Sequence, residues 1–566
     1  MSYKASIEDA EDEKILMEQL NRHTITRMRR PTRIATEDEI NSLPLHMEEE
    51  TMGPPISIEE TKLFMKDDVR EGFEATWDMH NAAPPKGHKP VFAKVPLQDW
   101  VCDRTEKAGC CEQVTPAMEK KYPTTDTILP RLVVEERDGD ERLRLIGWTK
   151  ADNARLKNSY KPNVPLKHVS AYLSAVHQHA GGKRDALKSY YQAEIPEWAR
   201  AKQRFKDESG RLWQMTRTSM GHCTMPEVMH TLVATIAGHP DYCKEEHVLR
   251  INECDIYIDG IRAADDEAKL KAYFQKVDAR AHAVNAQWKA KDSYIGKHYT
   301  FDGVDFDHET HKVRISEKLR KKLDNTTTDK LTLAGLESLI SRLIHGSAIT
   351  NTFQPKYYFV MKYARRRIAL MNRGISPDTP VEKMPEMIGK QLKHWIRTLV
   401  TSPFKTPPID ANRTPPTYVM FTDASPYGWG AVLIHLATGR VFIAGSKWPR
   451  NHHYEVNKDE VAAVALATEA FSRHLIPGSV VDLRVDNTSA EAGTNKGHSH
   501  SQGVSAELLK FLEAKEKYGV QMKASHVDTR FNYSDPVSRG IEPKWNLFDL
   551  RNGIGEQGGL AVFPLS

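Results

Sequence analysis

Four acidic residues near the end of the chain have the types and spacing of a metal site. Asp423 ends an apolar run, Glu460 opens a stretch of small and apolar residues with helical character, and Asp486 ends a second β-rich run. Asp535 follows a third strand-like segment at 523–527. Acids at strand ends and at a helix start can converge on one point, so we expect these four side chains to meet.

A cluster of carboxylates needs a cation, because buried carboxylates repel one another and lose solvation. Ligands that are all oxygen favour Mg²⁺ or Mn²⁺ over zinc. Two such ions, roughly 3.5–4 Å apart, activate water and stabilise the leaving oxygen of a phosphodiester. Together the four acids predict phosphodiester hydrolysis, although each acid alone is more typical of a helix cap or a turn.

A second pair of acids lies in the central region. Asp185 follows a glycine pair, and Asp259 lies in a segment at 255–262 that is typical of a tight β-hairpin. Two acids on neighbouring strands could hold Mg²⁺ against a triphosphate. By spacing alone, the interpretation as ordinary turn residues stays open.

The surrounding pattern predicts the elements that position these acids. Runs at 131–137 and 143–148 flank a turn and predict a hairpin, residues 164–180 have a mainly helical period, and segments at 204–205 and 212–215 predict a strand pair. The segment 356–367 is rich in aromatic and basic residues, which suits either nucleic-acid stacking or an ordinary amphipathic helix. Prolines between 403 and 416 predict a linker.

Composition indicates a soluble chain of several domains. It has 566 residues, of which 39% are hydrophobic and 28% charged, and the formal net charge is only +4. No apolar run approaches the roughly 20 residues that span a bilayer, and the start lacks a signal-peptide core, so we expect an intracellular protein, cytoplasmic or nuclear, with no membrane partner. Six cysteines predict no disulfide framework, and the spacing of Cys102, Cys110 and Cys111 does not complete a zinc site.

The C-terminal acids lie within longer motifs that resemble a known family. The motifs resemble those of the ribonuclease H domain of retrotransposon reverse transcriptases, most of all DIRS and VIPER-type elements. They are Thr422-Asp423-Ala424-Ser425 with Gly428-Trp429-Gly430, then Glu460, Asp486-Asn487, and Asn532 to Arg539. The resemblance implies that Asp423, Glu460, Asp486 and Asp535 are catalytic ligands of Mg²⁺ or Mn²⁺.

The central motifs extend the resemblance to the polymerase. Four segments are similar to the catalytic motifs and primer grip of reverse transcriptases. They are Asp185 with Tyr190 and Gln192, residues 219–226, Tyr257-Ile258-Asp259-Gly260, and residues 299–304. The similarity implies that Asp185 and Asp259 are catalytic metal ligands and that Tyr190 and Gln192 contact the nucleotide. The partners it implies are an RNA template, an RNA–DNA hybrid and dNTPs.

The expected fold is therefore an α+β polymerase right hand of fingers, palm and thumb, followed by an α/β ribonuclease H-like domain. We expect an N-terminal extension at 1–125, fingers and palm at 126–310, thumb or connection at 311–405, the ribonuclease H-like domain at 406–545 and a tail at 546–566.

One position departs from the polymerase pattern. Gly260 stands where a second aspartate is expected, and we expect it to form the turn of the hairpin. Loss of a carboxylate beside the metal ions weakens the polymerase prediction. Two alternatives therefore stay open: a protein that retains only hybrid binding and ribonuclease H activity, and a non-catalytic nucleic-acid-binding scaffold.

Overall fold

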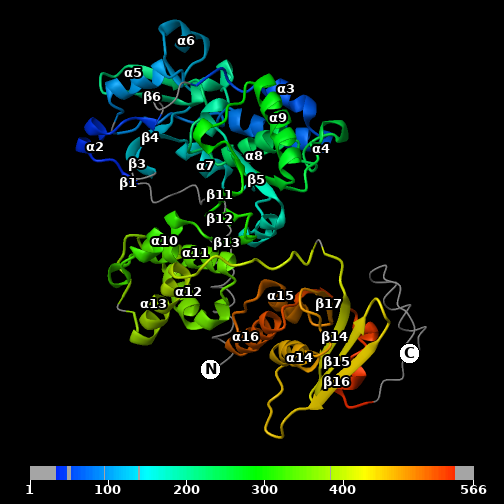
Figure 1. Ribbon diagram of the computed structural model, residues 1–566. Coiled ribbons are helices and arrows are strands. Elements are labelled where there is room, and N and C mark those ends of the chain that lie inside the picture. Colours follow the sequence, from blue (N-terminus) through cyan, green and yellow to red (C-terminus); the bar gives the residue numbers. More distant parts are fainter. Residues whose placement is uncertain are drawn as a thin grey trace.

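The computed structural model describes residues 33–46, 52–94, 96–137, 140–382, 384–412 and 414–541. The expected tail at 546–566 lies outside these residues. Strands and helices alternate irregularly along the chain, so the fold is mixed α and β (Figure 1). No helix in the described ranges is long and apolar enough to cross a membrane.

A four-stranded sheet carries the first pair of acids. Its order is β10-β5-β9-β8, with bounds Tyr294–Gly296, Ala180–Asp185, Gly260–Asp265 and Glu253–Tyr257. Helices α8 (Met225–Ile236) and α9 (Glu267–Ala283) pack on it through a common core.

Helices upstream of residue 125 belong to the same core. Met65, after α3 (Ile58–Phe64), and Phe73 of α4 (Asp67–Asn81) are buried with Leu232 and Phe274. The hydrophobic core thus continues across the expected boundary at residue 125. The four-residue spacing of Val69, Phe73 and Trp77 in α4 is that of an amphipathic helix and could have marked this helix in the sequence.

Two further sheets lie beside this core. The hairpin of β3 (Leu129–Arg137) and β4 (Asp140–Trp148), joined by β1 (Arg33–Ile34), confirms the predicted hairpin. The predicted strand pair is also confirmed, as β6 (Arg204–Lys206) and β7 (Leu212–Met215), which β2 (Cys111–Gln113) extends. Helix α5 (Asp99–Lys107) packs on β2, and α6 (Pro116–Lys121) and α7 (Lys150–Leu156) lie in the same stretch of the chain.

The predicted helix at 164–180 is wrong as a continuous helix. The structure has two short 3₁₀ helices, η2 (Val169–Ala171) and η3 (Leu173–His177), and β5 begins at Ala180. Leu173 and Val176 of η3 have the three-residue spacing that a 3₁₀ helix and an α-helix share, and Val169 lies in the separate η2. Periodicity therefore cannot tell the two apart.

A small sheet leads into a helical part. Strands β11 (His298–Phe301), β12 (Val304–Asp307) and β13 (Lys312–Ile315) form an antiparallel meander. Helices α10 (Glu317–Asp324), α11 (Leu333–Thr350), α12 (Tyr358–Asn372) and α13 (Glu386–Val400) follow. Phe306, Leu343 and Trp395 are buried in one core, so the meander and the helices fold together.

The C-terminal part is a five-stranded sheet of order β16-β15-β14-β17-β18. Strands β14 (Tyr418–Ala424), β15 (Gly428–His435) and β16 (Val441–Lys447) are antiparallel, whereas β17 (Val480–Val485) and β18 (Gln521–His526) run parallel to β14. Helices α14 (Val456–Ala470), α15 (Thr488–Lys496) and α16 (Gln502–Lys517) cover one face. The short η10 (Thr529–Phe531) and α17 (Asp535–Ser538) follow β18.

The central strand β14 is buried on both sides, which explains its continuous apolar sequence. Tyr418 and Met420 enter the core beneath the helices, whereas Val419 and Phe421 enter the second core on the opposite face. This two-residue alternation is that of a strand covered on both faces.

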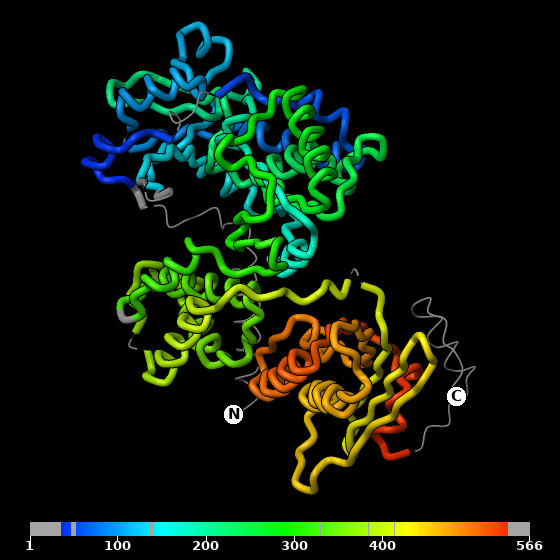
Figure 2. The backbone as a smooth tube through the Cα atoms, viewed as in Figure 1, coloured from blue at the N-terminus to red at the C-terminus, as the bar shows by residue number. Residues whose placement is uncertain are grey.

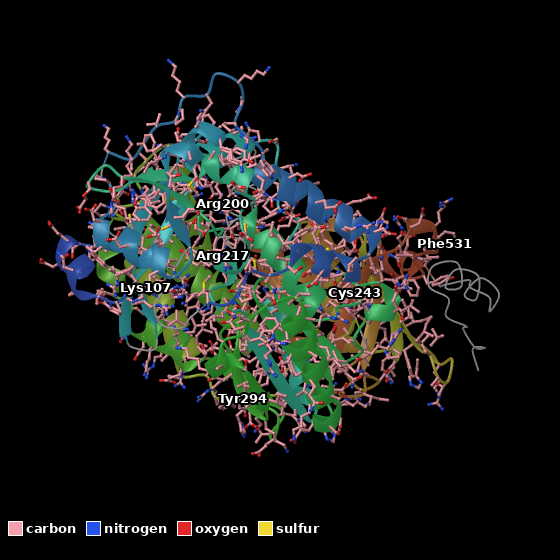
Figure 3. All side chains as sticks on the ribbon, turned by 90° about the horizontal axis from the view of Figure 1, so that it is seen from above. Lys107, Arg200, Arg217, Cys243, Tyr294 and Phe531 are labelled. Carbon is pink, nitrogen blue, oxygen red and sulfur yellow. The ribbon has the colours of Figure 1, made fainter. Side chains whose placement is uncertain are left out.

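The chain crosses from the helical part to the C-terminal part in an extended segment (Figure 2). The two parts also touch directly, since Tyr358 Oη donates to the carbonyl of His500 (2.8 Å) and Lys356 pairs with Glu513 (3.3 Å). In the view from above, Arg200 and Arg217 lie in the N-terminal elements, well apart from Phe531 of the C-terminal part (Figure 3).

Candidate active sites

Asp423 lies near the end of β14, directly opposite Gly430 of β15. The side chain is only 4% exposed. A Cβ on Gly430 would collide with the backbone of Ser534 and Ser538, so glycine there lets α17 approach the strand pair. The glycine of the sequence motif therefore brings α17 against Asp423.

Glu460 reaches the same point from α14. Buried Ala463 and Ala467 let this helix pack closely on the sheet. The backbone N–H of Ala424 donates to Glu460 Oε1 (3.3 Å), while Oε2 is buried and has no hydrogen-bond partner.

Asp486 follows the last residue of β17, which runs parallel to β14. Because parallel strands end at the same edge of a sheet, its carboxylate comes beside that of Asp423. One oxygen each from Asp423, Glu460 and Asp486 lies within 4.8 Å of the others. Three of the four expected acids thus converge.

The fourth acid, Asp535, lies next to this group without joining it. It opens α17, and its carboxylate is paired with Arg539 (2.9 Å). Ser538 of the same helix donates its hydroxyl hydrogen to Asp423 Oδ2. The loop before α17 is tied to β14 by Asn532, whose amide donates to the carbonyl of Thr422 (3.1 Å).

Both buried acids of the cluster resist ionisation. Loss of solvation raises the pKa of Asp423 to about 6, with Ser538 opposing this and the charges of Asp486 and Asp535 adding to it. Burial, followed by the charges of Asp423 and Asp486, raises the pKa of Glu460 to about 9. A pocket that disfavours its own negative charge and holds an unpartnered carboxylate oxygen fits a divalent cation.

Asp185 and Asp259 lie side by side in the N-terminal sheet. Asp185 ends β5, and the N–H of Ala186 donates to the carbonyl of Asp259 (2.9 Å). Loss of solvation and the neighbouring charge of Asp185 raise the pKa of Asp259 to about 6, although Lys289 lowers it.

The β8–β9 hairpin turns one step earlier than expected. Ile258 and Asp259 form the turn, and Ile258 has a φ of +54°. Gly260 is instead the first residue of β9, paired with Asp185, so the prediction that Gly260 forms the turn is wrong. The two-residue loop places the positive φ before the acid rather than after it.

The two expected nucleotide contacts are buried. Burial, aided by the charge of Asp259, raises the pKa of the Tyr190 phenol. The side chain of Gln192 donates to the carbonyls of Leu187 (2.6 Å) and Gln287 (2.9 Å) and accepts from the N–H of Gln287 (2.8 Å). These bonds fix the loop after Asp185.

Lys289 is a site residue that the sequence does not reveal. Its ammonium pairs with Asp185, and its backbone N–H donates to the Asp185 carbonyl (2.8 Å). A single lysine in a polar segment has no distinguishing pattern, so only the fold brings it to the acid.

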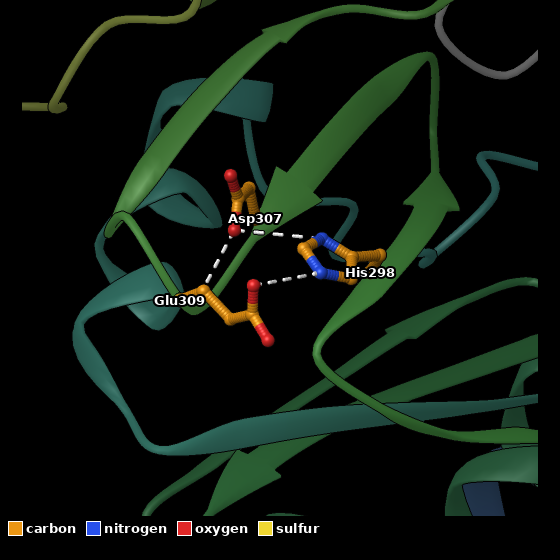
Figure 4. Close-up of side chains that lie close together, drawn as sticks. All are labelled: His298, Asp307 and Glu309. Carbon is orange, nitrogen blue, oxygen red and sulfur yellow. Dashed lines mark hydrogen bonds and ion pairs between the residues drawn. The ribbon is translucent and has the colours of Figure 1, made fainter.

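A second group that could hold a metal lies on the β11–β12 hairpin (Figure 4). His298 contacts Asp307 (3.4 Å) and Glu309 (3.5 Å), and Asp307 accepts the N–H of Glu309 (3.0 Å). The side chains of His298 and Glu309 are mostly exposed. Surface ion pairs of this kind are common without a metal.

Comparisons with known proteins find a distant likeness in structure alone. The sequence matches no protein-family model and no characterised protein sequence. A foamy viral protease–reverse transcriptase in complex with double-stranded DNA is 13% identical with a TM-score of 0.44, covering 84% of this chain and 98% of its own. A foamy viral protease–reverse transcriptase in complex with an RNA/DNA hybrid is 12% identical with a TM-score of 0.43, and the match covers 84% of this chain and 64% of that chain.

Proposed function

We propose that this chain is a reverse transcriptase of a retroelement with a ribonuclease H. It would synthesise DNA on an RNA template and hydrolyse the RNA strand of the resulting hybrid. The observation that carries the proposal is the convergence of Asp423, Glu460 and Asp486 within 4.8 Å at one edge of a five-stranded mixed sheet. The DIRS and VIPER-type assignment rests on the sequence motifs.

The nuclease site would lie at this edge. Asp423, Glu460 and Asp486 would hold Mg²⁺ or Mn²⁺, with Asp535 as a further ligand. When bound, the ions supply an activated water and stabilise the leaving oxygen of the scissile phosphodiester. Ser538 orients the Asp423 carboxylate by its hydrogen bond. Glu460, whose pKa is raised to about 9, gives up its proton when positive charge arrives.

The polymerase site would lie between Asp185 and Asp259. These two carboxylates would hold Mg²⁺ against the triphosphate of an incoming dNTP. Tyr190 and Gln192 would shape the nucleotide side of this site, Gln192 by fixing the loop that follows Asp185. In this scheme 126–310 would be the fingers and palm, extended by the upstream helices that share their core, 311–405 the thumb or connection, whose core also includes the meander β11–β13, and 406–545 the nuclease.

The decisive experiment measures hybrid cleavage and hybrid binding on the purified full chain. Wild-type protein and Asp423→Asn are compared for cleavage of an RNA–DNA hybrid and for retention of that hybrid at matched salt, with Mg²⁺ and with Mn²⁺. Cleavage should fall by orders of magnitude while binding persists, because the hybrid is held through its phosphates and its groove. Wild-type cleavage by the variant would refute the role of Asp423.

Two observations favour a second candidate, a nuclease that binds hybrids and no longer polymerises. Gly260 offers no carboxylate beside Asp185, and the ammonium of Lys289 already pairs with Asp185. A metal ion at this site would compete with that ammonium. Hybrid cleavage without dNTP incorporation, in Mg²⁺ and in Mn²⁺, would decide for this candidate.

A further inference from the structure

One buried contact holds the C-terminal part against the helical part. Arg365 and Tyr358 of α12 are only 5% and 8% exposed, and both donate to His500, in the loop between α15 and α16. Tyr358 Oη donates to the carbonyl of His500 (2.8 Å), and Arg365 Nη1 donates to its imidazole Nδ1. These two hydrogen bonds are called the His500 contact below.

The bond from Arg365 requires a neutral imidazole, because a guanidinium has donors only and Nδ1 must accept. Burial, followed by the charges of Arg365 and His498, lowers the pKa of His500 to about 3. The ring is therefore neutral at neutral pH. A hydrogen bond from a charged donor in surroundings that exclude water is stronger and more directional than one between neutral groups.

Phe353 crosses between the same two parts. It is 7% exposed and belongs to the core of the C-terminal part, whereas Tyr357, four residues later, belongs to the core of the helical part. Apolar contacts are non-directional, so one inserted ring holds two bodies together but lets them rotate about it. The ion pair of Lys356 with Glu513 is about half exposed and adds little.

The covalent connection leaves this rotation open. Lys405 exchanges two backbone hydrogen bonds with Val313, and the N–H of Thr417 donates to the carbonyl of Val480 (2.8 Å). Those residues between Lys405 and Thr417 that the structure describes form neither helix nor strand (Figure 2). Relative motion of two parts joined in this way is expected unless a specific contact prevents it. The His500 contact is directional and buried, and it can do so.

A hybrid that reaches both acidic sites would measure the distance between them along its axis. Rotation of the C-terminal part would change which phosphodiester lies at Asp423. We propose that Arg365 and His500 are positioning residues, which fix the distance between a DNA 3′ end held at Asp185 and Asp259 and the bond that is cleaved in the RNA strand. This inference rests on the function proposed above for its substrate. Both residues act through the placement of the C-terminal part and not on the reacting atoms.

The test measures the lengths of the first cleavage products from an end-labelled RNA annealed to a shorter DNA with a recessed 3′ end. The wild type should give one main length. Tyr358→Phe combined with His500→Leu removes both hydrogen bonds and should weaken the contact by about 10- to 150-fold, the usual effect of losing a hydrogen bond to a charged group. The product lengths should then spread, while cleavage of a long hybrid without a recessed end keeps its wild-type rate.

Two matched variants separate positioning from a general disturbance of the contact region. His500→Asn keeps an oxygen acceptor close to the place of Nδ1 and should restore the single length. Lys356→Gln removes the half-exposed ion pair beside the contact and should leave the length unchanged. A single length in the double variant, an equal spread in Lys356→Gln, or a spread already present in the wild type would overturn the inference.

A distance measurement keeps the inference testable if the proposed nuclease fails. Spin labels are placed at Met387→Cys in α13 and at Ile476→Cys after α14, which are 63% and 54% exposed, in a chain whose two half-buried cysteines, Cys223 and Cys254, are replaced by serine. The wild type should give a narrow distance distribution and the double variant a broad one. Absence of hybrid cleavage by the wild type would refute the proposed function alone, whereas equal widths in the two proteins would refute the positioning role alone.

Discussion

Replacing Asp423 by asparagine should stabilise the metal-free C-terminal part at neutral and alkaline pH. Asp423 is 4% exposed and lies beside two other carboxylates. Its pKa is raised from 3.8 to about 6, so the folded chain binds this proton more tightly than the unfolded chain does. The stabilisation of the folded state by the protonated Asp423 side chain is therefore fully present below about pH 4 and is lost as pH rises through 6.

The size of the effect follows from the raised pKa. One pKa unit corresponds to about 1.4 kcal/mol, so ionised Asp423 costs the folded state about 3 kcal/mol at pH 8. Asparagine keeps the shape and can still accept from Ser538, but it carries no charge. Since a buried amide also loses solvation, we expect a gain of about 1–3 kcal/mol, or about 5- to 150-fold in local opening.

Hydrogen exchange of peptides from β14 and β17 in the full chain measures this local opening free energy. In EDTA at pH 8, the Asp423→Asn variant should exchange more slowly than the wild type, and below pH 4 the two should agree. Mg²⁺ should slow exchange in the wild type more than in the variant.

The matched control for this measurement is Asp482→Asn in β17, whose carboxylate pairs with Arg484 (2.6 Å). Removing a partnered carboxylate should give no gain in protection. Equal or faster exchange in Asp423→Asn than in the wild type, in EDTA at pH 8, would show that burial and the neighbouring carboxylates do not disfavour ionised Asp423.

Three further substitutions probe the two acidic sites. Gly260→Asp should raise dNTP incorporation, because it adds a carboxylate beside Asp185 where there is room for it: a Cβ there would meet its nearest neighbours, Asp185 Oδ1 among them, at 3.6–3.7 Å. An unchanged rate would mean that more than one ligand is lost. Lys289→Gln should raise the pKa of Asp259 and move the rising limb of the pH–rate profile for incorporation to higher pH, and an unmoved limb would contradict the pairing. Gly430→Ala should displace α17 and lower hybrid cleavage at least tenfold, whereas full cleavage would show that α17 does not position the site.

The sequence predicts best those elements that one local pattern defines. The hairpin of β3 and β4 has two β-rich runs around a turn, and β14 has a continuous apolar run. The segment 164–180 has the spacing of a helix but folds as 3₁₀ turns, because the spacing of its buried residues is common to both. The helices before residue 125 complete a core whose other residues lie more than a hundred positions later, so their local pattern does not reveal which part of the chain they pack on.

The segment 356–367 shows how far helical spacing predicts burial. Val360, Ala364 and Ile368 of α12 are buried, as in an ordinary amphipathic helix. Phe359 and Tyr363 nevertheless line an open cavity together with basic residues. Helical spacing fixes which residues share a face, but only the neighbouring helix decides whether that face is covered.

The position of Asp535 outside the three-carboxylate group does not argue against a role in metal binding. Its partner Arg539 is four residues along the chain, and the arginine side chain is 44% exposed. An exposed ion pair of this spacing contributes only about 0.3–0.5 kcal/mol. A divalent cation beside Asp423 and Asp486 would attract Asp535 far more strongly than Arg539 does, because the ion carries two charges and binds carboxylate oxygens directly. Arg539 thus holds Asp535 within reach of the cluster in the metal-free chain, at a cost small enough for a cation to overcome.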